Sequence, residues 1–405
     1  MVRKMKDSGI EWIGEIPEGW ELRKGKSLYR VATGKLDANA ESPDGDYPFF
    51  TCSMVPKRIN SYSFDCEALL VAGNGLVGFT QYYKGKFDAY QRTYVLSDFR
   101  NVLPSFLRYY VSVGLPMEVQ PKSIGSVIQF IKLGDLLNFN ITLPSIEQQT
   151  IISNYLEFKI IRIDAILSKT RSSIEEYKKL KQAVITQAVT KGVRGEREMK
   201  DSGVEWIGEI PVDWTIQRFA RVAEVKSNLV SPDNYLEYPQ ISPENIEKDS
   251  GKLLLPCKTV GEVGIISGNH LFHKGQILYS KIRPKLNKVC IAPFDGLCSA
   301  DMYPIETNND TRYIMYCILS DGFLQQVSMI TENRVKMPKV NQVELSKILV
   351  AIPETIAEQK EIADYLDTKC AEIDGLIVKK EQLVKELESY KKSLIYEVVT
   401  GKREV

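Results

Sequence analysis

The sequence is poor in the features on which membrane and exported proteins depend. No run of about 18 apolar residues occurs among its 405 residues, so no membrane-spanning helix is expected. The first dozen residues also lack the apolar stretch of a secretory signal. These absences predict a cytoplasmic protein without membrane contact.

The chain also lacks an excess of charge of either sign. It has 53 Lys and Arg residues and 52 Asp and Glu residues, which leave a formal net charge of +1. A nucleic-acid surface on this protein therefore has to be a local cluster of cations that acids balance elsewhere.

The side chains of metal, redox and nucleophilic chemistry are scarce. There are two histidines, and the seven cysteines are an odd set without a C-x-x-C pair. This favours reduced thiols over a disulfide framework or a zinc site. The G-x-S-x-G, P-loop, N-P-P-Y and D-P-P-Y patterns are absent as well. The sequence thus predicts no catalytic residue, no metal site and no cofactor bound by this chain.

Two short patterns match functional motifs but fail their further requirements. Gly73-Asn74-Gly75-Leu76-Val77-Gly78 fits G-x-G-x-x-G, yet β-rich residues rather than a helix follow it, so a hairpin is favoured over a nucleotide-binding turn. His270 and His273 form H-x-x-H, but no further ligands lie at matching spacing nearby. A structural role is therefore favoured over zinc binding.

What the chain does have is a long internal repeat. MKDSGIEWIGEIPEGW at Met5 to Trp20 returns as MKDSGVEWIGEIPVDW at Met199 to Trp214, and all four tryptophans lie in these two copies. A second matching pair, residues 148–167 and 358–377, is offset by 210 residues. Between these pairs the halves share only strand candidates, at 68–71 and 276–279, and helical patterns, at 106–111 and 313–318. The chain is therefore two copies of one unit.

The helical segments carry apolar residues at alternating steps of three and four. Residues at this spacing form one stripe along a helix, which we call a seam. The first seam comprises Ile163, Leu167, Thr170, Ile174, Tyr177, Lys181, Val184 and Ala188. The second comprises Ile373, Ile377, Lys380, Val384, Leu387, Lys391, Leu394 and Val398. Both are heptad patterns broken at the same two places by polar residues, which typically fix register and partner. Each seam needs a helical partner, and the other copy is the nearest candidate.

These patterns predict an α+β fold with a pseudo-two-fold internal repeat. Two tandem α+β domains are separated by two long, antiparallel, coiled-coil-like helices. The expected boundaries are 1–20 for the first repeat motif, 21–143 for the first variable domain, 144–198 for the central helical spacer, 199–214 for the second motif, 215–352 for the second variable domain and 353–405 for the C-terminal helical spacer.

Basic clusters are the remaining functional signal. In the second variable domain they comprise Lys281, Arg283, Lys285 and Lys288, followed by Arg334, Lys336 and Lys339. In the first they comprise Lys57, Arg58, Lys84, Lys86, Arg92 and Lys122. Each of these cations taken alone fits a solvated surface charge. As a set, with Tyr and Gln residues interleaved, they fit a DNA-binding surface, because Lys and Arg contact phosphates and Arg, Asn and Gln contact base edges.

The pattern as a whole resembles the DNA-specificity (S) subunits of Type I restriction-modification systems. The resemblance rests on the doubled D-S-G-x-E-W-I-G-E-I-P-x-x-W motif, on P-x-x-x-x-E-Q-K-x-I-A-x-Y-L-D-x-K at Pro353 to Lys369, and on G-Q-I-L-Y-S-K-I-R-P-x-L-N-K at Gly275 to Lys288. It covers essentially the whole chain. The first helical copy departs from the second in having Gln148 where the second has Glu358.

The resemblance implies two target-recognition domains, each reading one half of a bipartite, asymmetric double-stranded DNA target, with helices that set the spacer. It also implies docking to two methyltransferase subunits and assembly with restriction/translocase subunits. S-adenosylmethionine, ATP and Mg are then expected in the partner subunits, and this chain is expected to be a non-catalytic subunit.

Three alternatives remain open at the level of sequence. One is a specificity subunit of a related modification-only system. Another is a self-contained DNA methyltransferase or nuclease, which the missing motifs disfavour. The third, a coiled-coil scaffold, leaves the two variable domains without a role.

Overall fold

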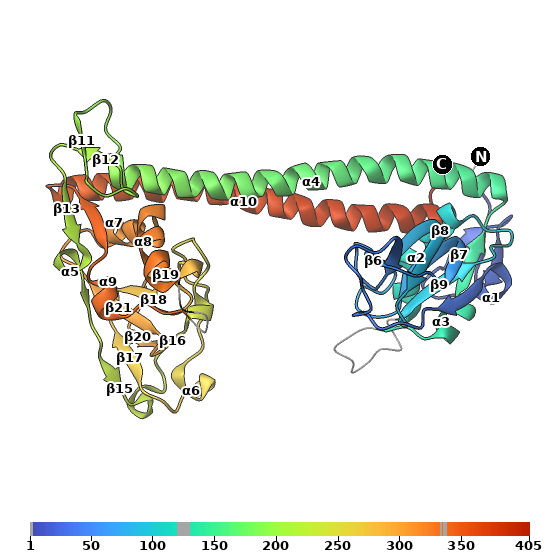
Figure 1. The fold of residues 1–405 in the computed structure, drawn as a ribbon, viewed down its shortest axis with the longest axis horizontal. Helices are drawn as coiled ribbons and strands as arrows, with labels where there is room; N and C mark the ends of the chain where they lie inside the picture. Colours follow the sequence, from blue (N-terminus) through green and yellow to red (C-terminus); the bar gives the residue numbers. More distant parts are fainter. Residues whose placement is uncertain (1–2, 120–129, 333, 335–337) are drawn as a thin grey trace. The chain divides into compact units, whose positions relative to one another are not determined.

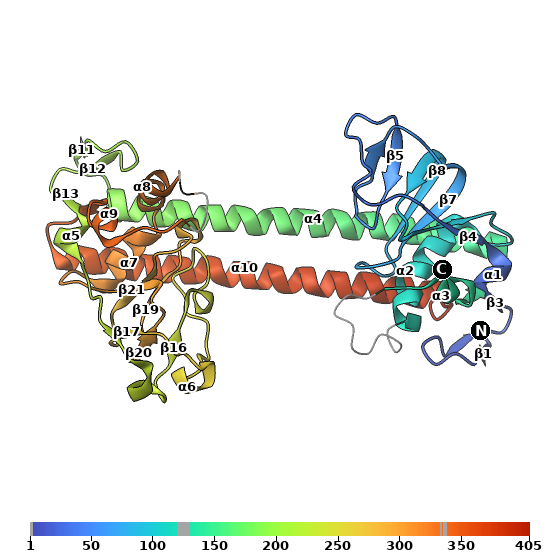
Figure 2. The ribbon, with the colours of Figure 1, turned by 60° about the horizontal axis from the view of Figure 1, so that its bottom comes forward.

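A computed structural model describes residues 3–119, 130–332, 334 and 338–405. The chain forms two compact units: unit 1 comprises Met1–Arg171 and Gln382–Val405, and unit 2 comprises Ser172–Glu381. Two long helices, α4 (Ile146–Lys191) and α10 (Ile356–Val399), contribute to both units (Figure 1). In each unit a part of α4 lies beside a part of α10 and runs antiparallel to it (Figure 2).

Unit 1 carries one large sheet. Its further elements are β1 (Met5–Asp7), β2 (Glu15–Pro17), β3 (Glu21–Lys24), α1 (Gly25–Leu28), β4 (Arg30–Thr33), β5 (Tyr47–Phe50), β6 (Lys57–Ile59), β7 (Phe64–Ala72), β8 (Thr80–Ala89), β9 (Thr93–Ser97), α2 (Pro104–Val119), α3 (Leu133–Leu137) and β10 (Asn140–Leu143). The six-stranded sheet has the order β4-β9-β7-β8-β5-β6.

The strand β7 shows why this sheet has a core on both faces. Its last five residues, Ala68 to Ala72, are all buried. Because side chains alternate along a strand, Leu69 and Val71 join the core with α2, whereas Ala68 and Leu70 pack with Phe50 and Phe87 on the other face. The apolar run at 68–71 is therefore a strand, as the sequence predicts, and the structure shows that it is buried on both sides.

Unit 2 has two smaller sheets in place of the large one. Its further elements are β11 (Met199–Asp201), β12 (Glu209–Pro211), β13 (Thr215–Arg218), α5 (Phe219–Val222), β14 (Glu224–Val225), β15 (Leu229–Val230), η2 (Pro232–Tyr235), β16 (Gln240–Ile241), η3 (Pro243–Asn245), α6 (Val260–Val263), β17 (Asn269–Phe272), β18 (Ile277–Ser280), η4 (Pro284–Leu286), β19 (Val289–Ile291), β20 (Gly296–Cys298), β21 (Met302–Glu306), α7 (Thr311–Leu319), α8 (Asp321–Thr331), α9 (Gln342–Leu345) and β22 (Leu349–Ile352). The sheets have the orders β14-β21-β18-β19 and β15-β17-β20-β16.

An antiparallel two-stranded ladder closes each variable segment at its base. In unit 1, β3 pairs with β10 so that Glu21 lies opposite Leu143. In unit 2, β13 pairs with β22 so that Thr215 lies opposite Ile352. Each variable segment therefore begins and ends at one place. We call the parts that both units share, which are the repeat motif, this closing ladder and the long helices, the repeated frame.

The long helices start in the same way in both copies. Ser145 Oγ accepts the N–H of Gln148, and Thr355 Oγ1 accepts the N–H of Glu358, so a hydroxyl caps each first turn. One residue further on, a buried glutamine ties each long helix to the residue that directly precedes an earlier helix, α2 in unit 1 and α7 in unit 2. Gln149 accepts the backbone N–H of Leu103 at 2.8 Å, and Gln359 accepts that of Asp310 at 3.0 Å. The repeated sequence therefore forms equivalent hydrogen bonds in both copies.

The heptad seams lie on the paired faces of the helices. Every seam position is buried or half-buried; Ile163, Leu167, Ile174, Ile373 and Leu394 are buried, whereas the seam positions Tyr177, Val184, Ile377, Val384 and Leu387 are half-buried.

The two lysines that interrupt the seams each pair with an aspartate on the opposite helix. In unit 2, Lys181 of α4 lies 2.9 Å from Asp374 of α10, which Lys252 also contacts at 2.6 Å. In unit 1, Lys391 of α10 lies 2.6 Å from Asp164 of α4. Lys181 and Lys391 are 210 residues apart, as are Asp164 and Asp374, so the ion pairs repeat with the sequence. They fix the register of each antiparallel pair.

We expect Asp374→Asn to destabilise unit 2 far more than Asp164→Asn destabilises unit 1. The side chains of Lys181 and Asp374 are 8% and 17% exposed, against 29% and 50% for Lys391 and Asp164. Removing one partner of a buried pair leaves an uncompensated charge and costs about 3 kcal/mol, whereas an exposed pair contributes about 1 kcal/mol or less. Urea unfolding followed by circular dichroism measures both, and equal losses would contradict this account.

The loss caused by Asp374→Asn should also depend on pH. Burial pushes the pKa of Asp374 up, but hydrogen bonds from Lys252 and Lys181 outweigh it and hold the pKa below the usual value. A carboxyl with a depressed folded pKa stabilises the protein above its unfolded pKa and loses this effect as pH falls through the folded pKa. The difference between the two proteins should therefore shrink below about pH 4.

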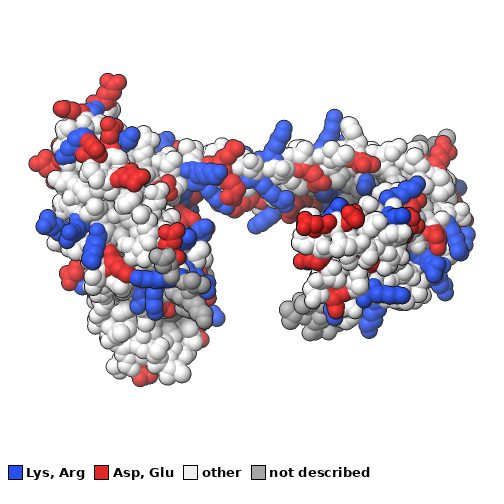
Figure 3. Space-filling view, viewed as in Figure 1, with Lys and Arg blue, Asp and Glu red and all other residues white. Residues whose placement is uncertain are grey.

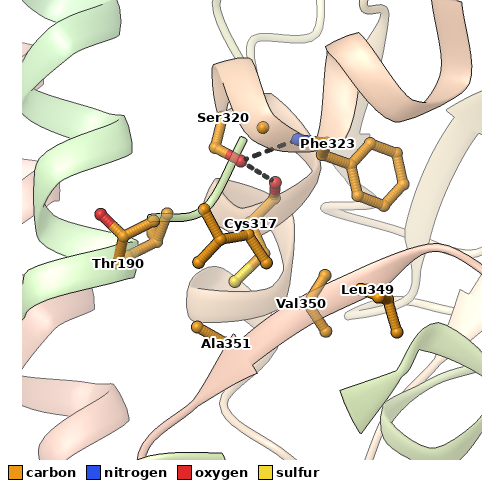
Figure 4. Close-up of a pocket in the computed structure, with 10 residues that line it drawn as sticks. Thr190, Cys317, Ser320, Phe323, Leu349, Val350 and Ala351 are labelled. Carbon is orange, nitrogen blue, oxygen red and sulfur yellow. Dashed lines mark hydrogen bonds between the residues drawn. The ribbon is translucent and has the colours of Figure 1, made fainter. Parts of the chain in front are cut away.

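The C-terminal part of α4 is anchored in the core of unit 2 (Figure 4). Ser320 caps α8 by accepting the N–H of Phe323, and it donates to the carbonyl of Cys317 at the end of α7. Beside this junction, Thr190 of α4 and Val350 of β22 line a cavity of about 20 Å³. Such a volume has room for roughly one water molecule, so this gap is a packing defect rather than a ligand site.

Candidate nucleic-acid interface

The basic loop of unit 2 is a rigid hairpin connection between β18 and β19. Residues on both sides of η4, Arg283 and Asn287, have positive φ angles of 46° and 40°. Non-glycine residues adopt this conformation rarely and only where their surroundings hold them. Asn287 is 1% exposed and donates to the carbonyl of Leu319, while Pro284 is buried beside it. The buried asparagine and proline thus fix a loop whose Arg283 and Lys285 side chains are exposed.

The structure brings the two basic clusters of unit 2 together. Ile282 forms an antiparallel bridge with Lys339, and the N–H of Arg283 donates to the carbonyl of Pro338 at 2.8 Å. Val340 in turn donates its N–H to Lys281. Segments almost 60 residues apart in the sequence therefore form one basic surface, which we call the basic loop surface: Lys281, Arg283, Lys285, Lys288, Arg334 and Lys339. Figure 3 shows Lys and Arg side chains gathered on the side of unit 2 that carries β18 and β19 in Figure 1.

Three of the six cations of the basic loop surface already contact other residues of the protein. Lys281 lies over the ring of Tyr303, Lys288 donates to the carbonyl of Pro243 at 2.6 Å, and Arg334 pairs with Glu344. For Arg283, Lys285 and Lys339, all exposed, the described residues supply no side-chain hydrogen bond or ion pair. These three are the cations with donors left for a phosphate or a base edge. Lys336 lies outside the described residues.

The basic residues of unit 1 form a weaker case. Lys84 and Lys86 share one face of β8, and their register partners on β7 are Glu67 and Asp65. This face is therefore a mosaic of both charges, and Lys86 also lies over the ring of Tyr62. A phosphate that approached the two lysines would meet the two acids as well.

The other cations of unit 1 divide in the same way. On β6, Lys57 pairs with Glu41 at 2.7 Å and Arg58 donates to the carbonyl of Gly45 at 2.9 Å. Arg92, in the turn before β9, is exposed, and no side-chain partner is described for it. It is therefore the first candidate for a DNA contact in this unit, while Lys122 lies outside the described residues.

Exposed apolar residues near the loops of both units gave no signal in the sequence. Met54 and Val55 in unit 1 are 67% and 75% exposed, and Gln81 donates to the carbonyl of Met54. Ile266 in unit 2 is 95% exposed between two glycines, Gly264 and Gly268. Apolar side chains at loop tips are able to contact thymine methyl groups or insert at a base step. No local periodicity marks such positions.

Both short motifs lie in or beside paired β-strands. Gly73 to Gly78 connect β7 to β8, which pair antiparallel, so the hairpin interpretation is confirmed. His270 is buried on β17, where burial and then the charge of Lys281 lower its pKa. Among the described residues no group of three or more His, Cys, Asp or Glu side chains could hold a metal.

All seven cysteines are free, and burial raises the pKa of Cys290 to about 12, so this thiol is unreactive. Within the described residues, no helix combines the length and apolar character needed to span a bilayer.

The two units thus combine different sheet arrangements with equivalent closing ladders and long helices, and each unit has at least one exposed cation for which no side-chain partner is described. The family model "Type I restriction modification DNA specificity domain" matches the chain twice, at residues 17–176 and 211–386. The chain therefore belongs to the Type I restriction-modification DNA specificity family.

Individual relatives agree with this assignment. The chain is 36% identical over 378 residues to the specificity subunit of the Type I restriction enzyme EcoDI of Escherichia coli, covering 90% of this chain and 84% of that protein. It is 22% identical to the MjaVIII specificity subunit of Methanocaldococcus jannaschii, covering 96% and 93%. A solved chain from work on complex assembly and conformational transition of the Type I restriction-modification system has the same fold, with a TM-score of 0.68 at 14% identity over 96% of this chain and 99% of that one.

Proposed function

We propose that each unit reads one half of a bipartite, asymmetric double-stranded DNA target. The observation that carries this proposal is that the repeated frame is the same in both units, whereas the sheets of the variable segments, which we call the readers, differ. The repeat motif, the closing ladder and the capped helix recur in both units, whereas the reader is a six-stranded sheet in unit 1 and two four-stranded sheets in unit 2. Unlike readers on equivalent frames recognise unlike sequences, so the target is not a palindrome.

The long helices set the distance between the two half-sites and dock the methyltransferase subunits. Apolar residues flank the seam at repeat-equivalent positions, Ile166 and Leu180 on α4 and Leu376 and Tyr390 on α10, and each is more than 40% exposed. Exposed apolar side chains in register on a helix are typical of a surface that a partner covers. Because the set occurs once per copy, it fits two equivalent partner subunits.

The chemistry belongs to the partners in this proposal. The methyltransferase subunits bind S-adenosylmethionine, and restriction/translocase subunits bind ATP and Mg. The chain supplies sequence recognition as the non-catalytic subunit, and its place of action is the cytoplasm, where the DNA is.

The basic loop surface is tested by Arg283→Gln combined with Lys285→Gln, with Lys84→Gln combined with Lys86→Gln as the matched control. Both double variants remove two positive charges. Glu67 and Asp65 lie opposite Lys84 and Lys86, whereas no ion pair is described for Arg283 or Lys285. We expect the first to weaken DNA binding by the methyltransferase complex and to flatten its salt dependence by about one unit for each lost phosphate contact. The control should change neither the DNA affinity nor its salt dependence by a comparable amount. Fluorescence anisotropy at several salt concentrations measures this, and equal effects would refute the assignment.

A further inference from the structure

In unit 2 a buried carboxylate joins the repeat motif to the start of α10. The side chain of Glu358 is 4% exposed and accepts from Trp214 Nε1 at 3.1 Å. The same oxygen accepts from the guanidinium of Arg197 at 2.5 Å, and this arginine also lies over the Trp214 ring. A carboxylate, an indole N–H and a guanidinium therefore form one satisfied group at the first turn of the helix.

Unit 1 builds the same group without the carboxylate. Trp20, equivalent to Trp214, is 2% exposed, and Arg3, equivalent to Arg197, lies over its ring at 5.4 Å. The position of Glu358 is occupied by Gln148, whose side chain is exposed. Trp20 Nε1 is buried and has no hydrogen-bond partner among the described residues. A buried donor without an acceptor is costly and rare in a folded protein.

The equivalent positions around Trp20 also lack the other acids of the unit 2 site. There, Asp213 and Glu361 pair with Arg197 and Arg194. The residues equivalent to the three acids in unit 1 are Gly19, Gln148 and Ile151. The residues that line the cavity beside Trp20 include Arg3, Lys4, Glu18 and Gln148. The single acid, Glu18, is exposed and forms no ion pair within the described residues.

We propose that this cavity of unit 1 binds a carboxylate supplied from outside the chain, in the place that Glu358 fills in unit 2. One carboxylate group would accept from Trp20 Nε1 and from the Arg3 guanidinium, as Glu358 does from their equivalents. The position at the first turn of the 46-residue helix α4 adds a favourable dipole. The source is either a small carboxylate in solution or an acidic side chain of a partner protein, and the chemistry is the same for both. The cavity is lined by none of the cations proposed to contact DNA, so carboxylate binding there does not rest on the proposed function, whereas the identification of a partner as its source does.

The test follows the four indole N–H signals of the full chain labelled with ¹⁵N-tryptophan, assigned by single Trp→Phe variants. Sodium acetate replaces sodium chloride at constant ionic strength. We expect the Trp20 signal to shift downfield and to saturate, and the Trp214 signal to stay, because Glu358 already fills its site. Arg3→Gln should abolish the response. Gln148→Glu should place the Trp20 signal near its acetate-bound position without acetate, and Glu358→Gln should make Trp214 responsive to acetate.

Two results would overturn the proposal. One is a Trp20 signal that does not saturate with acetate in the wild type and does not move in Gln148→Glu. The other is a Trp20 signal that moves in Glu18→Gln without acetate, since Glu18 would then already fill the cavity. If Gln148→Glu fails to fold, Arg3→Gln and the wild-type titration still decide.

A further arm identifies the source by comparing the affinity of the wild type and Gln148→Glu for the methyltransferase subunit. A loss on the order of tenfold in Gln148→Glu assigns the carboxylate to that partner, because the built-in acid then excludes and repels it. An unchanged affinity assigns it to a solute. Since the acetate titration contains neither DNA nor partner, its outcome is independent of whether the chain reads a bipartite target.

Discussion

Replacing residues 215–352 with the equivalent segment of a relative should change one half of the DNA target and leave the other half and the gap unchanged. The physical reason is the closing ladder. Thr215 and Ile352 lie opposite each other in the β13 and β22 pair, so the exchanged segment leaves and rejoins the frame at one place. Unit 1, which reads the other half, shares no residue with the segment.

The graft has to preserve the contacts that α7 makes with the frame. Tyr313 Oη lies 3.3 Å from the carbonyl oxygen of Val189, Arg312 pairs with Asp364 and Asp367, and the backbone N–H of Asp310 donates to Gln359 Oε1. A donor segment that carries these residue types at the equivalent positions is therefore the proper choice. The matched control exchanges residues 21–143, which should change the opposite half. A change in both halves from either exchange would show that the units do not read separately.

Inserting four residues after Arg171 together with four after Glu381 should lengthen the gap between the half-sites by one or two base pairs. Both points lie at the division between the units and are 210 residues apart. The pairs Lys181 with Asp374 and Lys391 with Asp164 each lie within one unit and are preserved. Four helical residues add about 6 Å, and DNA rises about 34 to 36 Å in roughly ten base pairs.

Four residues are slightly more than one helical turn, so the seam continues as a stutter and the helices stay paired. The matched control inserts two residues at each point, which turns the following seam by about 200° at 3.6 residues per turn and should unfold or inactivate the protein. Methylation maps of DNA modified in the presence of each variant measure the gap. A four-residue variant that keeps the original gap would show that the helices do not set the distance.

The parts of the fold that the sequence predicts are those encoded locally or by repetition. The heptad steps of residues 163–188 and 373–398 predict long helices, and the helical patterns at 106–111 and 313–318 are α2 and α7. Lysines 181 and 391 interrupt both seams at equivalent places, which predicts partner choice but not the aspartates they meet. Amphipathic spacing defines a face, whereas the partner of a face depends on tertiary packing.

The candidate interface was predictable only as a composition of basic residues. Nothing in the spacing of Lys84 and Lys86 indicates that Glu67 and Asp65 face them, since cross-strand register depends on the hairpin as a whole. The bridge between Ile282 and Lys339 likewise joins segments with no common pattern. The sheets also differ between the units, because the variable segments share little beyond one strand and one helix. The sequence therefore predicts the repeat motifs and the long helices well, but it predicts the sheets and the basic surfaces of the variable segments poorly.

The most direct test of the central claim is a map of N6-methyladenine in DNA incubated with this chain, its methyltransferase partner and S-adenosylmethionine. Single-molecule sequencing should find one bipartite motif with two unlike halves and a constant gap, and no methylation when the partner is left out. Methyl transfer by the chain alone, or a continuous or palindromic motif, would contradict the assignment of two unlike reading units on a non-catalytic frame.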